Sequence, residues 1–249
     1  DAYDTIDWLV KNTPEANGRV GMIGSSYPGF TTAMGLINPH PALKAAVPQS
    51  PMIDGWMGDD WFHYGAFRAR NVDWFTSQMT KKGAGTNVPR QGFDDYDNFL
   101  RAGSFGDFAK AAGLDQIAAY RKITEHPAYD AFWQEQALDR ILAKQPLKVP
   151  TLWMGALWDQ EDMWGAIHAY LAVEPKDTAN DMNFLALGPW RHSGTNYEQR
   201  ELGQLKLPGD TATEFRLTTL KPFLDRYLKT SAPKADIAFV TIFETGSMR

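Results

Sequence analysis

The chain has 249 residues, 43% of them hydrophobic, which is enough apolar material for a buried core in one large domain or in a core with an insertion. Its 25 basic and 30 acidic side chains leave a net charge of -5 without a block of Lys and Arg, so we expect neither nucleic acid nor a membrane as a partner. No apolar run approaches the roughly 20 residues of a membrane span, and the absence of cysteine excludes disulfides and thiol chemistry.

The first fifth of the chain predicts two helices and two short strands. Apolar side chains recur at helical spacing over residues 1–11, and the segment NTPEANG ends that helix. Residues 20–23 form a short apolar stretch between glycines, and 31–37 predicts a helix that stops at a Pro-rich turn. Residues 43–47 predict another strand. The local pattern is therefore strand, sharp turn, helix, strand.

The middle of the chain has a different character. Residues 51–145 are helical in pattern, aromatic and polar, with Gly-rich breaks and no strand-like alternation. This pattern predicts an inserted, mostly helical subdomain.

Strand patterns return after the insertion. Residues 149–154 and 182–187 predict strands, and residues 163–171 between them predict a helix. Alternation of strand and helix on both sides of the insertion indicates a parallel sheet covered by helices. A last helix is expected at 212–229, before an alternating segment at 237–243.

The segment RVGMIGSSYPGF, residues 19–30, places two serines in a Gly-rich turn between a strand and a helix. A nucleophilic serine in such a turn needs small neighbours, because its backbone angles are strained and other backbone passes close by. Gly24 lies two residues before Ser26, whereas Ser25 has Ile23 in that place. The predicted nucleophile is Ser26, although G-x-S-x-x-G misses the common G-x-S-x-G by one position. An ordinary turn is the alternative.

Candidate partners for this serine follow the later strands. A hydrolase with this type of sheet carries its groups in the chain order Ser, acid, His. Asp159 follows the strand in VPTLWMGALWDQED, and His192 follows the next strand in FLALGPWRHSG. The other histidines lie in a Pro-rich turn, in the insertion or in a helical pattern. Asp159 could instead cap a helix and His192 could be a surface residue, but three placements in one order favour catalysis.

Four segments, GSSYPGF, MIDGWMGDDWFHYGAFR, GALWDQEDMWGA and GPWRHSG, together resemble the alpha-amino acid ester hydrolases, which are serine enzymes related to cocaine esterase and the X-prolyl dipeptidyl peptidases. The resemblance covers nearly the whole chain. It implies an α/β-hydrolase core, with a helical cap and a following jelly-roll domain. It also implies that Ser26 is the nucleophile, Asp159 the acid and His192 the base.

The resemblance sets the expected domain organisation. The α/β-hydrolase core is expected in two parts, at residues 1–50 and 146–230, with the helical cap inserted at 51–145. Residues 231–249 are expected to form a link and the first strand of the jelly-roll domain. Because the chain begins at what resembles the helix before the elbow strand, we expect it to be an internal part of a longer protein.

The resemblance further implies carboxylates that receive a free α-ammonium group of the substrate, and they correspond to Asp60, Glu161 and Asp162. Three acids that converge on a partly desolvated pocket would raise some of their pKa values, and a cationic group would offset this. The alternative is that these side chains are solvated acids or charges at helix N-termini.

The expected mechanism is an acyl-enzyme mechanism. His192 takes the hydroxyl proton of Ser26, and the backbone N–H of Tyr27 is the expected oxyanion donor. Relatives draw a second donor from an upstream tyrosine. Cap aromatics, among them Trp56, Trp61 and Tyr64, are predicted to line the acyl pocket, with core packing as the alternative for each.

The predicted partner is a small molecule with a free α-amino group, and no cofactor or metal ion is expected. Water would release the acyl group as an acid, whereas an amine such as a β-lactam nucleus would give acyl transfer. The resemblance implies homo-oligomers and a periplasmic or secreted location. A related esterase, acylase or X-prolyl peptidase stays open, as does a hydrolase-fold module without catalytic activity.

Overall fold

The structure is a computed structural model that describes residues 1–58, 61–69, 72–80, 88, 94–232 and 236–247. Its core is a five-stranded sheet in the order β1-β2-β5-β6-β9, in which every neighbouring pair of strands is parallel. The strands are β1 Val20–Ser25, β2 Leu43–Gln49, β5 Thr151–Ala156, β6 Asn183–Gly188 and β9 Val240–Ile242. The parallel sheet expected from the alternation of strands and helices is therefore present.

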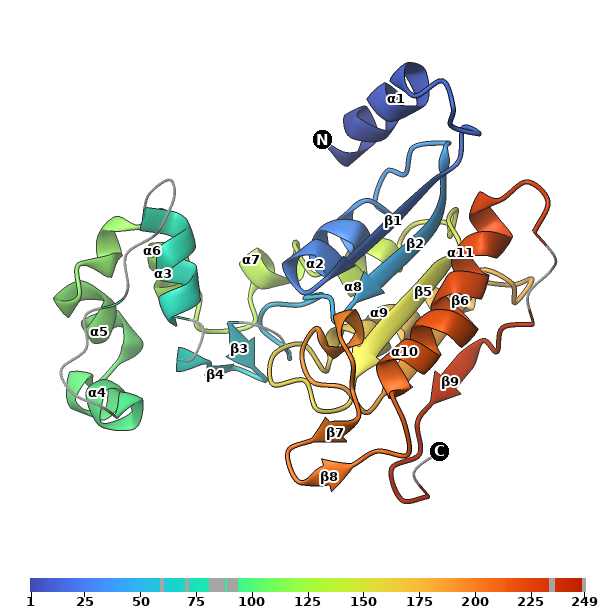
Figure 1. The fold of residues 1–249 in the computed structure, drawn as a ribbon. Coiled ribbons are helices and arrows are strands. Elements are labelled where there is room, and N and C mark those ends of the chain that lie inside the picture. The colour runs from blue at the N-terminus through green and yellow to red at the C-terminus, as the bar shows by residue number, and fades with distance from the viewer. Residues whose placement is uncertain (59–60, 70–71, 81–87, 89–93, 233–235, 248–249) are drawn as a thin grey trace.

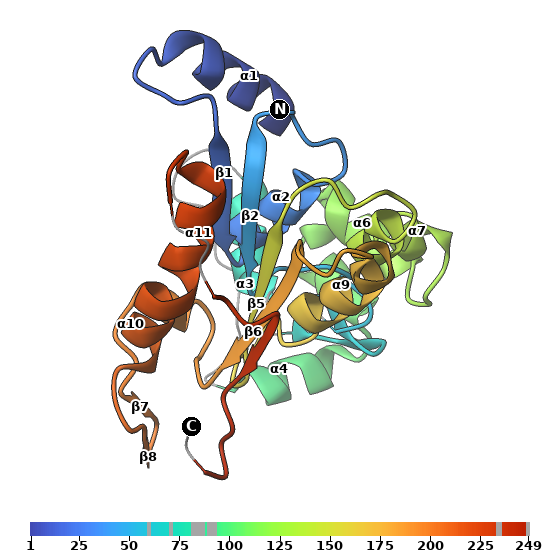
Figure 2. The ribbon, with the colours of Figure 1, turned by 90° about the vertical axis from the view of Figure 1, so that its right-hand side faces the viewer.

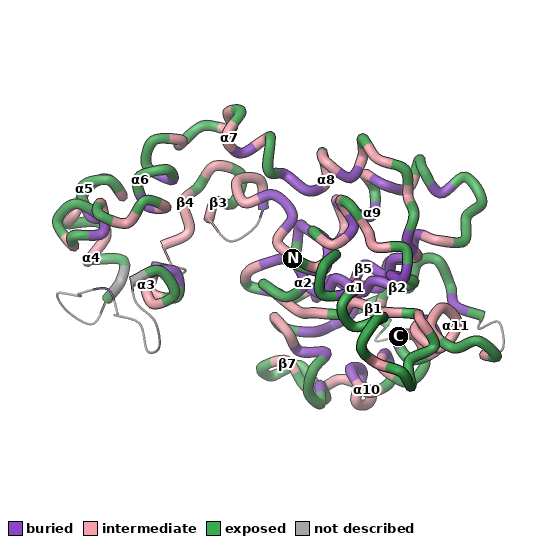
Figure 3. The backbone as a smooth tube through the Cα atoms, turned by 90° about the horizontal axis from the view of Figure 1, so that it is seen from above, coloured by how far each residue is buried: buried purple, intermediate pink, exposed green. Residues whose placement is uncertain are grey.

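Helices cover both faces of this sheet (Figure 2). All six residues of β5 and of β6 are buried, as expected for strands packed on both sides. Trp153 of β5 belongs to one apolar cluster and its neighbour Leu152 to the other, since successive side chains point to opposite faces. Figure 3 shows the burial concentrated along these central strands.

The helices divide between the two faces. One face carries α1 Ala2–Asn12, α2 Tyr27–Met34, α8 Leu138–Leu142 and α9 Gly165–Val173. The other face carries α10 Thr211–Phe215, a π-helical turn at Arg216–Leu220, and α11 Lys221–Leu228. Among the described residues, no helix has both the length and the apolar character that a bilayer crossing requires.

The cap lies to one side of the core and has its own apolar cluster, which includes Phe75, Tyr120 and Trp133 (Figure 1). Its elements are β3 Phe62–His63, β4 Ala66–Phe67, α3 Val72–Thr80, α4 Asp95–Ala102, α5 Phe105–Ala111, α6 Ala118–Glu125 and α7 Ala131–Gln134. Leu138 and Leu142, which were expected within the cap, pack in the cluster of the core sheet.

Two short hairpins were missed by the strand patterns. β3 and β4 pair across Tyr64 and Gly65, whose φ angles of 50° and 86° are both positive, as a tight two-residue hairpin turn requires. A second hairpin joins β7 Glu201–Leu202 to β8 Leu205–Lys206. Strands of two residues are too short to show alternation, so the sequence pattern did not mark them, and the cap is mostly helical apart from β3 and β4.

The last third differs from expectation in two further places. The helix expected at 212–229 is interrupted by the π-helical turn, which ends just before Pro222, a residue that has no backbone N–H to continue an α-helical ladder. The strand expected to begin a jelly-roll domain is β9, which instead pairs with β6 at the edge of the core sheet. An alternating pattern predicts an extended segment but does not specify the sheet it joins.

Candidate active site

Ser26 lies at a strained turn between β1 and α2. Its φ of 65° and ψ of -126° fall outside the regions that most residues other than glycine adopt. Its backbone N–H donates to the carbonyl of Gln49 at 3.0 Å, which ties the turn to the end of β2. A half-buried serine at such a strand-to-helix turn has the placement of a nucleophile elbow.

Two glycines make this turn possible. A Cβ atom at Gly24 would lie 2.4 Å from the carbonyl oxygen of Pro28, and one at Gly29 would lie 2.4 Å from that of Gln49. Both neighbours are backbone atoms, so neither position accepts a side chain without movement of the elbow. Pro28 itself stands in the first turn of α2, where its missing N–H is not needed.

The structure brings Asp159 and His192 together. Asp159 lies three residues beyond β5 and is only 3% exposed. Its Oδ1 accepts the backbone N–H groups of Glu161 at 2.8 Å and Asp162 at 3.1 Å. His192 follows β6, and its Nδ1 lies 2.8 Å from each carboxylate oxygen of Asp159. The acid loop and the histidine loop therefore meet beyond the carboxyl ends of their strands.

The charge of Asp159 is set by opposing effects. Burial alone would raise the pKa of Asp159, but the hydrogen bond and positive charge of His192 and the two backbone N–H donors outweigh it, so the pKa lies below its ordinary value. The group is an ionised carboxylate at neutral pH. Such a partner favours a proton on Nδ1, which makes Nε2 the nitrogen that can take up a proton.

The elbow and the histidine loop are also hydrogen-bonded to each other. The hydroxyl oxygens of Ser25 and Ser193 lie 2.9 Å apart, one residue from Ser26 and one residue from His192. Farther along the loop, Thr195 Oγ1 donates to Gln49 Oε1 at 2.9 Å. These contacts place the three predicted triad positions at one end of the sheet, on the side where the cap is attached (Figure 1).

Two of the three predicted ammonium-binding carboxylates lie beside the imidazole. Glu161 Oε2 is 3.5 Å from His192 Nε2, and the fully buried Asp162 places Oδ2 3.7 Å from Nδ1. One possible ligand atom from each of Glu161, Asp162 and His192 lies within 4.8 Å of the other two. This spacing is close enough to surround a cation, either an ammonium group or a metal ion. Asp60 lies outside the described residues.

The acid loop is held from the cap by Arg68, which follows β4. Its Nη1 donates to the carbonyl of Glu161 at 3.1 Å, and its Nη2 donates to the carbonyl of Gln160. Sequence reasoning gave Arg68 no role, although it ends the segment MIDGWMGDDWFHYGAFR. Ser193 was also missed, although it follows His192 directly. The hydrogen bonds of both residues join distant segments, and no local sequence pattern marks such a contact.

The aromatic residues near the elbow differ in placement. Tyr27 is 55% exposed at the start of α2, and its ring centroid lies 6.3 Å from that of Trp74 in α3, which sequence reasoning did not select. Trp61 packs edge-on against Phe75 at 4.4 Å, and Tyr64 is 60% exposed at the hairpin turn.

Trp56 packs at 5.1 Å on Tyr129, also within the cap. The packing contact of Trp56 therefore agrees with the alternative role considered for it, whereas Trp61 also lines a cavity between α2 and the cap. An acyl-pocket role for these residues stays a prediction.

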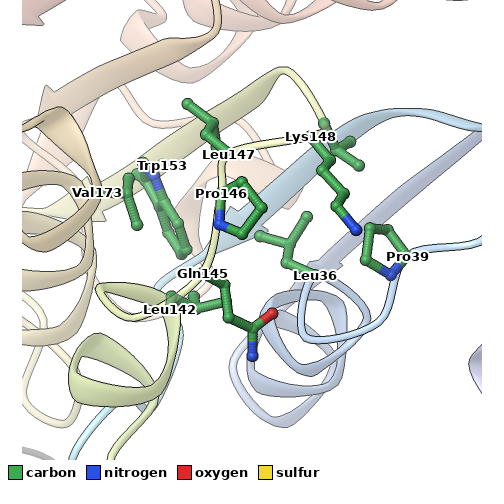
Figure 4. A pocket seen from close by; sticks show the side chains of 10 residues that line it. Leu36, Pro39, Leu142, Gln145, Pro146, Leu147, Lys148, Trp153 and Val173 are labelled. Carbon is green, nitrogen blue, oxygen red and sulfur yellow. The ribbon is translucent and has the colours of Figure 1, made fainter. Parts of the chain in front are cut away.

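Two cavities lie away from the elbow. One, of about 20 Å³, precedes β5 at the far end of the sheet and has room for little more than one water molecule (Figure 4). Its lining includes Leu36, Pro39, Leu142, Gln145, Lys148 and Trp153. The other, of about 410 Å³, lies between β6, β9 and α10. A third, of about 360 Å³, lies between α2 and the cap, with Phe30, Met34 and Trp61 in its lining.

Comparison with known proteins identifies several relatives. The family model "X-Pro dipeptidyl-peptidase (S15 family)" matches residues 1–194. Cocaine esterase from Rhodococcus sp. (strain MB1 Bresler) is 28% identical over 246 residues, covering 92% of this chain and 40% of the esterase. A putative serine esterase from Mycobacterium bovis is 23% identical over 231 residues, covering 78% of this chain and 35% of the relative.

Solved structures agree with these relatives. The solved structure of an alpha-amino acid ester hydrolase is 65% identical to this chain, with a TM-score of 0.97. The match covers 100% of this chain and 41% of that protein. An aminopeptidase from the marine sediment archaeon Thaumarchaeota archaeon is 49% identical with a TM-score of 0.95 and the same coverage, 100% and 41%. The chain thus spans 40% to 41% of the length of cocaine esterase and of these two structures.

A hydrolase of the CocE/NonD family from Staphylococcus aureus shares the fold. It is 21% identical with a TM-score of 0.55, and the match covers 97% of this chain and 34% of that protein. The predicted α/β-hydrolase fold and the predicted resemblance are therefore confirmed. Because the family model covers residues 1–194 of the 249, the chain belongs to the X-Pro dipeptidyl-peptidase (S15) family of hydrolases.

Proposed function

We propose that this chain forms the catalytic core of a serine hydrolase that cleaves esters of α-amino acids through an acyl-enzyme. The observation that carries the proposal is the hydrogen-bonded pair of Asp159 and His192 on a loop joined to the strained elbow of Ser26. The 65% identity to an alpha-amino acid ester hydrolase supports the substrate class.

In the proposed reaction, His192 Nε2 removes the hydroxyl proton of Ser26 as Oγ attacks the ester carbonyl carbon. Asp159 stabilises the imidazolium that forms. The backbone N–H of Tyr27, which begins α2, donates to the developing oxyanion. When the C–O bond breaks, His192 returns the proton to the leaving alcohol, and water then repeats these steps in reverse to release the acid.

Selection of an α-amino acid is attributed to Glu161 and Asp162. Both carboxylates lie within 3.7 Å of the imidazole, so an α-ammonium group beside a carbonyl at Ser26 would come close to negative charge. The Asp162 side chain is only 1% exposed and that of Glu161 24%, which shields this charge from water. A buried carboxylate gains from a nearby cation, and the ammonium group supplies one.

Labelling with a fluorophosphonate tests the nucleophile. We expect one label per chain on Ser26, no label on Ser26→Ala, and full labelling of Ser77→Ala, a control in the cap. Asp159→Asn should label slowly and lower kcat by roughly 10³- to 10⁴-fold, because the imidazole loses its orienting partner. A wild-type protein that reacts no faster than Ser26→Ala contradicts the proposal of a serine hydrolase.

A pair of substrates tests the carboxylates. Phenylglycine methyl ester should be hydrolysed faster than its des-amino analogue, phenylacetic acid methyl ester. Glu161→Gln should lower kcat/KM for the amino ester about 10- to 100-fold, since one hydrogen bond to a charged group is lost, and change the des-amino ester less than about 2-fold. Equal kcat/KM for both esters in the wild type would remove the amino-group specificity and leave the hydrolase proposal standing.

The aminopeptidase neighbour, which is 49% identical, favours a second candidate function. The N-terminal residue of a peptide also carries a free α-ammonium group, so the same carboxylates would suit a peptidase. Turnover of an X-Pro anilide at a rate comparable to the amino ester would favour this reading. An amine that replaces water as the acyl acceptor would give an amide, including amides of a β-lactam nucleus. Analysis of the products formed with added amine measures the ratio of acyl transfer to hydrolysis.

A further inference from the structure

We infer that Ser25, the serine beside the nucleophile, is a positioning residue that holds the His192 loop against the elbow through the hydroxyl of Ser193. The inference rests on the proposed roles of Ser26 and His192. Its direct evidence is the distance of 2.9 Å between the two hydroxyl oxygens, in a partly buried setting.

The hydrogen bond between Ser25 and Ser193 joins the sheet to the histidine loop. Ser25 is the last residue of β1 and pairs in register with Gln49 of β2, so its backbone is fixed by the sheet. Ser193 belongs to a loop, whose backbone is not fixed by hydrogen bonds to a neighbouring strand. One hydrogen bond therefore connects a rigid position one residue before Ser26 to a loop position one residue after His192.

The conformation of Ser193 indicates that its hydroxyl is used. Its φ of 57° and ψ of 14° are left-handed, a region that favours glycine over serine. A glycine stands at the next position, Gly194, yet the left-handed conformation falls on the serine. The bond to Ser25 gives a physical reason for a side chain at the strained position.

Other contacts hold the rest of the loop, so the loss of this bond should not unfold it. Asp159 holds the ring of His192 at Nδ1. Downstream, Thr195 donates to the Gln49 side chain, and Arg216 Nη1 donates to the Thr195 carbonyl at 2.5 Å. The Ser25–Ser193 bond lies one residue from each reacting group, and its role is the alignment of Nε2 with the Ser26 hydroxyl.

This alignment has a kinetic consequence. Proton transfer needs the nucleophile oxygen and the base nitrogen at about 2.6–3.2 Å, and a small displacement lowers the rate of the chemical step far more than it lowers substrate binding. Loss of the Ser25 bond should therefore lower kcat and leave KM nearly unchanged.

The test is a double-mutant cycle on the purified protein with phenylglycine methyl ester. Ser25→Ala should lower kcat about 10-fold, with KM within about 2-fold and an unchanged melting temperature. Ser193→Gly removes the hydroxyl and suits the left-handed backbone, so it should be as stable as the wild type or more stable, with the same loss of kcat. Ser25→Thr keeps a hydroxyl and should retain most of the rate, and Thr5→Ala is the surface control.

The double variant separates this inference from a general structural effect. If Ser25 acts through Ser193, the double variant loses no more kcat than either single variant, and the acid limb of the pH profile stays in place because the Asp159 contact is intact. The inference would be overturned by any of three results. These are a wild-type kcat in Ser25→Ala, a loss of kcat in the double variant equal to the product of the two single losses, or a lower melting temperature without a lower kcat. A wild type without esterase activity would instead refute the proposed function, and the inference with it.

Discussion

At Ser26 the backbone takes a conformation that serine does not favour. Neighbouring glycines make this conformation possible, because they have no side chains that would clash with the turn. Gly24 leaves room for the carbonyl of Pro28, and Gly29 leaves room for that of Gln49. The G-x-S-x-x-G spacing thus reflects close backbone contacts on both sides of the serine. The glycine after the serine is shifted by one position from the common pattern and still meets such a contact.

A substitution at Gly29 tests this explanation. Gly29→Ala would place a Cβ 2.4 Å from the Gln49 carbonyl oxygen, so we expect a loss of about 1–3 kcal/mol in the free energy of unfolding, together with a lower kcat. Gly209→Ala is the matched control, because no atom lies within 4 Å of its added Cβ. Urea unfolding of both variants checks the contrast, and equal stabilities would show that the elbow tolerates a side chain.

At the scale of elements, the start of α10 is joined to the segment that follows the histidine loop. Asp210 caps this helix: its Oδ1 accepts the N–H of Thr213 at 3.1 Å and that of Gln199 at 2.9 Å. The hydrogen bond from the Thr213 hydroxyl, with these N–H donors and the charge of Arg200, lowers the pKa of Asp210 to about 2. One side chain therefore anchors both a helix and a loop.

This cap predicts a pH-dependent contribution to stability. Asp210→Ala should cost about 1 kcal/mol at neutral pH, the usual value of an N-cap. Because the folded pKa of about 2 lies below the ordinary value of 3.8, the contribution is fully present above about pH 4 and is lost as the pH falls towards 2.

The difference in unfolding free energy between wild type and Asp210→Ala, measured in urea from pH 7 to pH 2.5, should shrink at the acid end. Asp236→Ala, at an exposed position, is the control. A difference that stays constant with pH would contradict the assigned pKa.

At the scale of the whole molecule, the cap and the core have separate apolar clusters and are linked by specific polar contacts. The Tyr129 hydroxyl, on the chain that returns from the cap, donates to Asp54 at 2.5 Å on the chain that enters it. Burial, followed by the Asp54 carboxylate, raises the pKa of Tyr129 to about 12, so it stays a donor. Arg68 makes a further link, to the acid loop.

Removal of the Arg68 link should affect selectivity more than folding. Arg68→Met deletes two hydrogen bonds to the carbonyls of Gln160 and Glu161, so the Glu161 carboxylate loses its fixed position. We expect KM for phenylglycine methyl ester to rise about tenfold, while the des-amino ester changes little.

Arg101→Met is the matched control, since that cap side chain is 74% exposed and pairs with Asp97 of its own helix. Equal effects of Arg68→Met on both esters would contradict a role for Arg68 in placing the carboxylate.

The sequence by itself determined the features that local chemistry encodes. Apolar periodicity marked the core strands and most of the core helices, and turn composition marked the elbow. Chain order then selected Ser26, Asp159 and His192 as the predicted triad, and the structure joins the last two directly.

Only the tertiary structure decided which segments meet. Ser25 and Ser193 are 168 positions apart, and Arg68 lies 93 positions from Glu161, so no window of sequence contains either contact. The same holds for β9, whose alternating pattern suits any sheet edge but whose partner is β6. Periodicity reports the environment of a residue along its own segment, whereas packing of the whole chain selects its neighbours, and for that reason the positioning contacts of this site became visible only in the folded molecule.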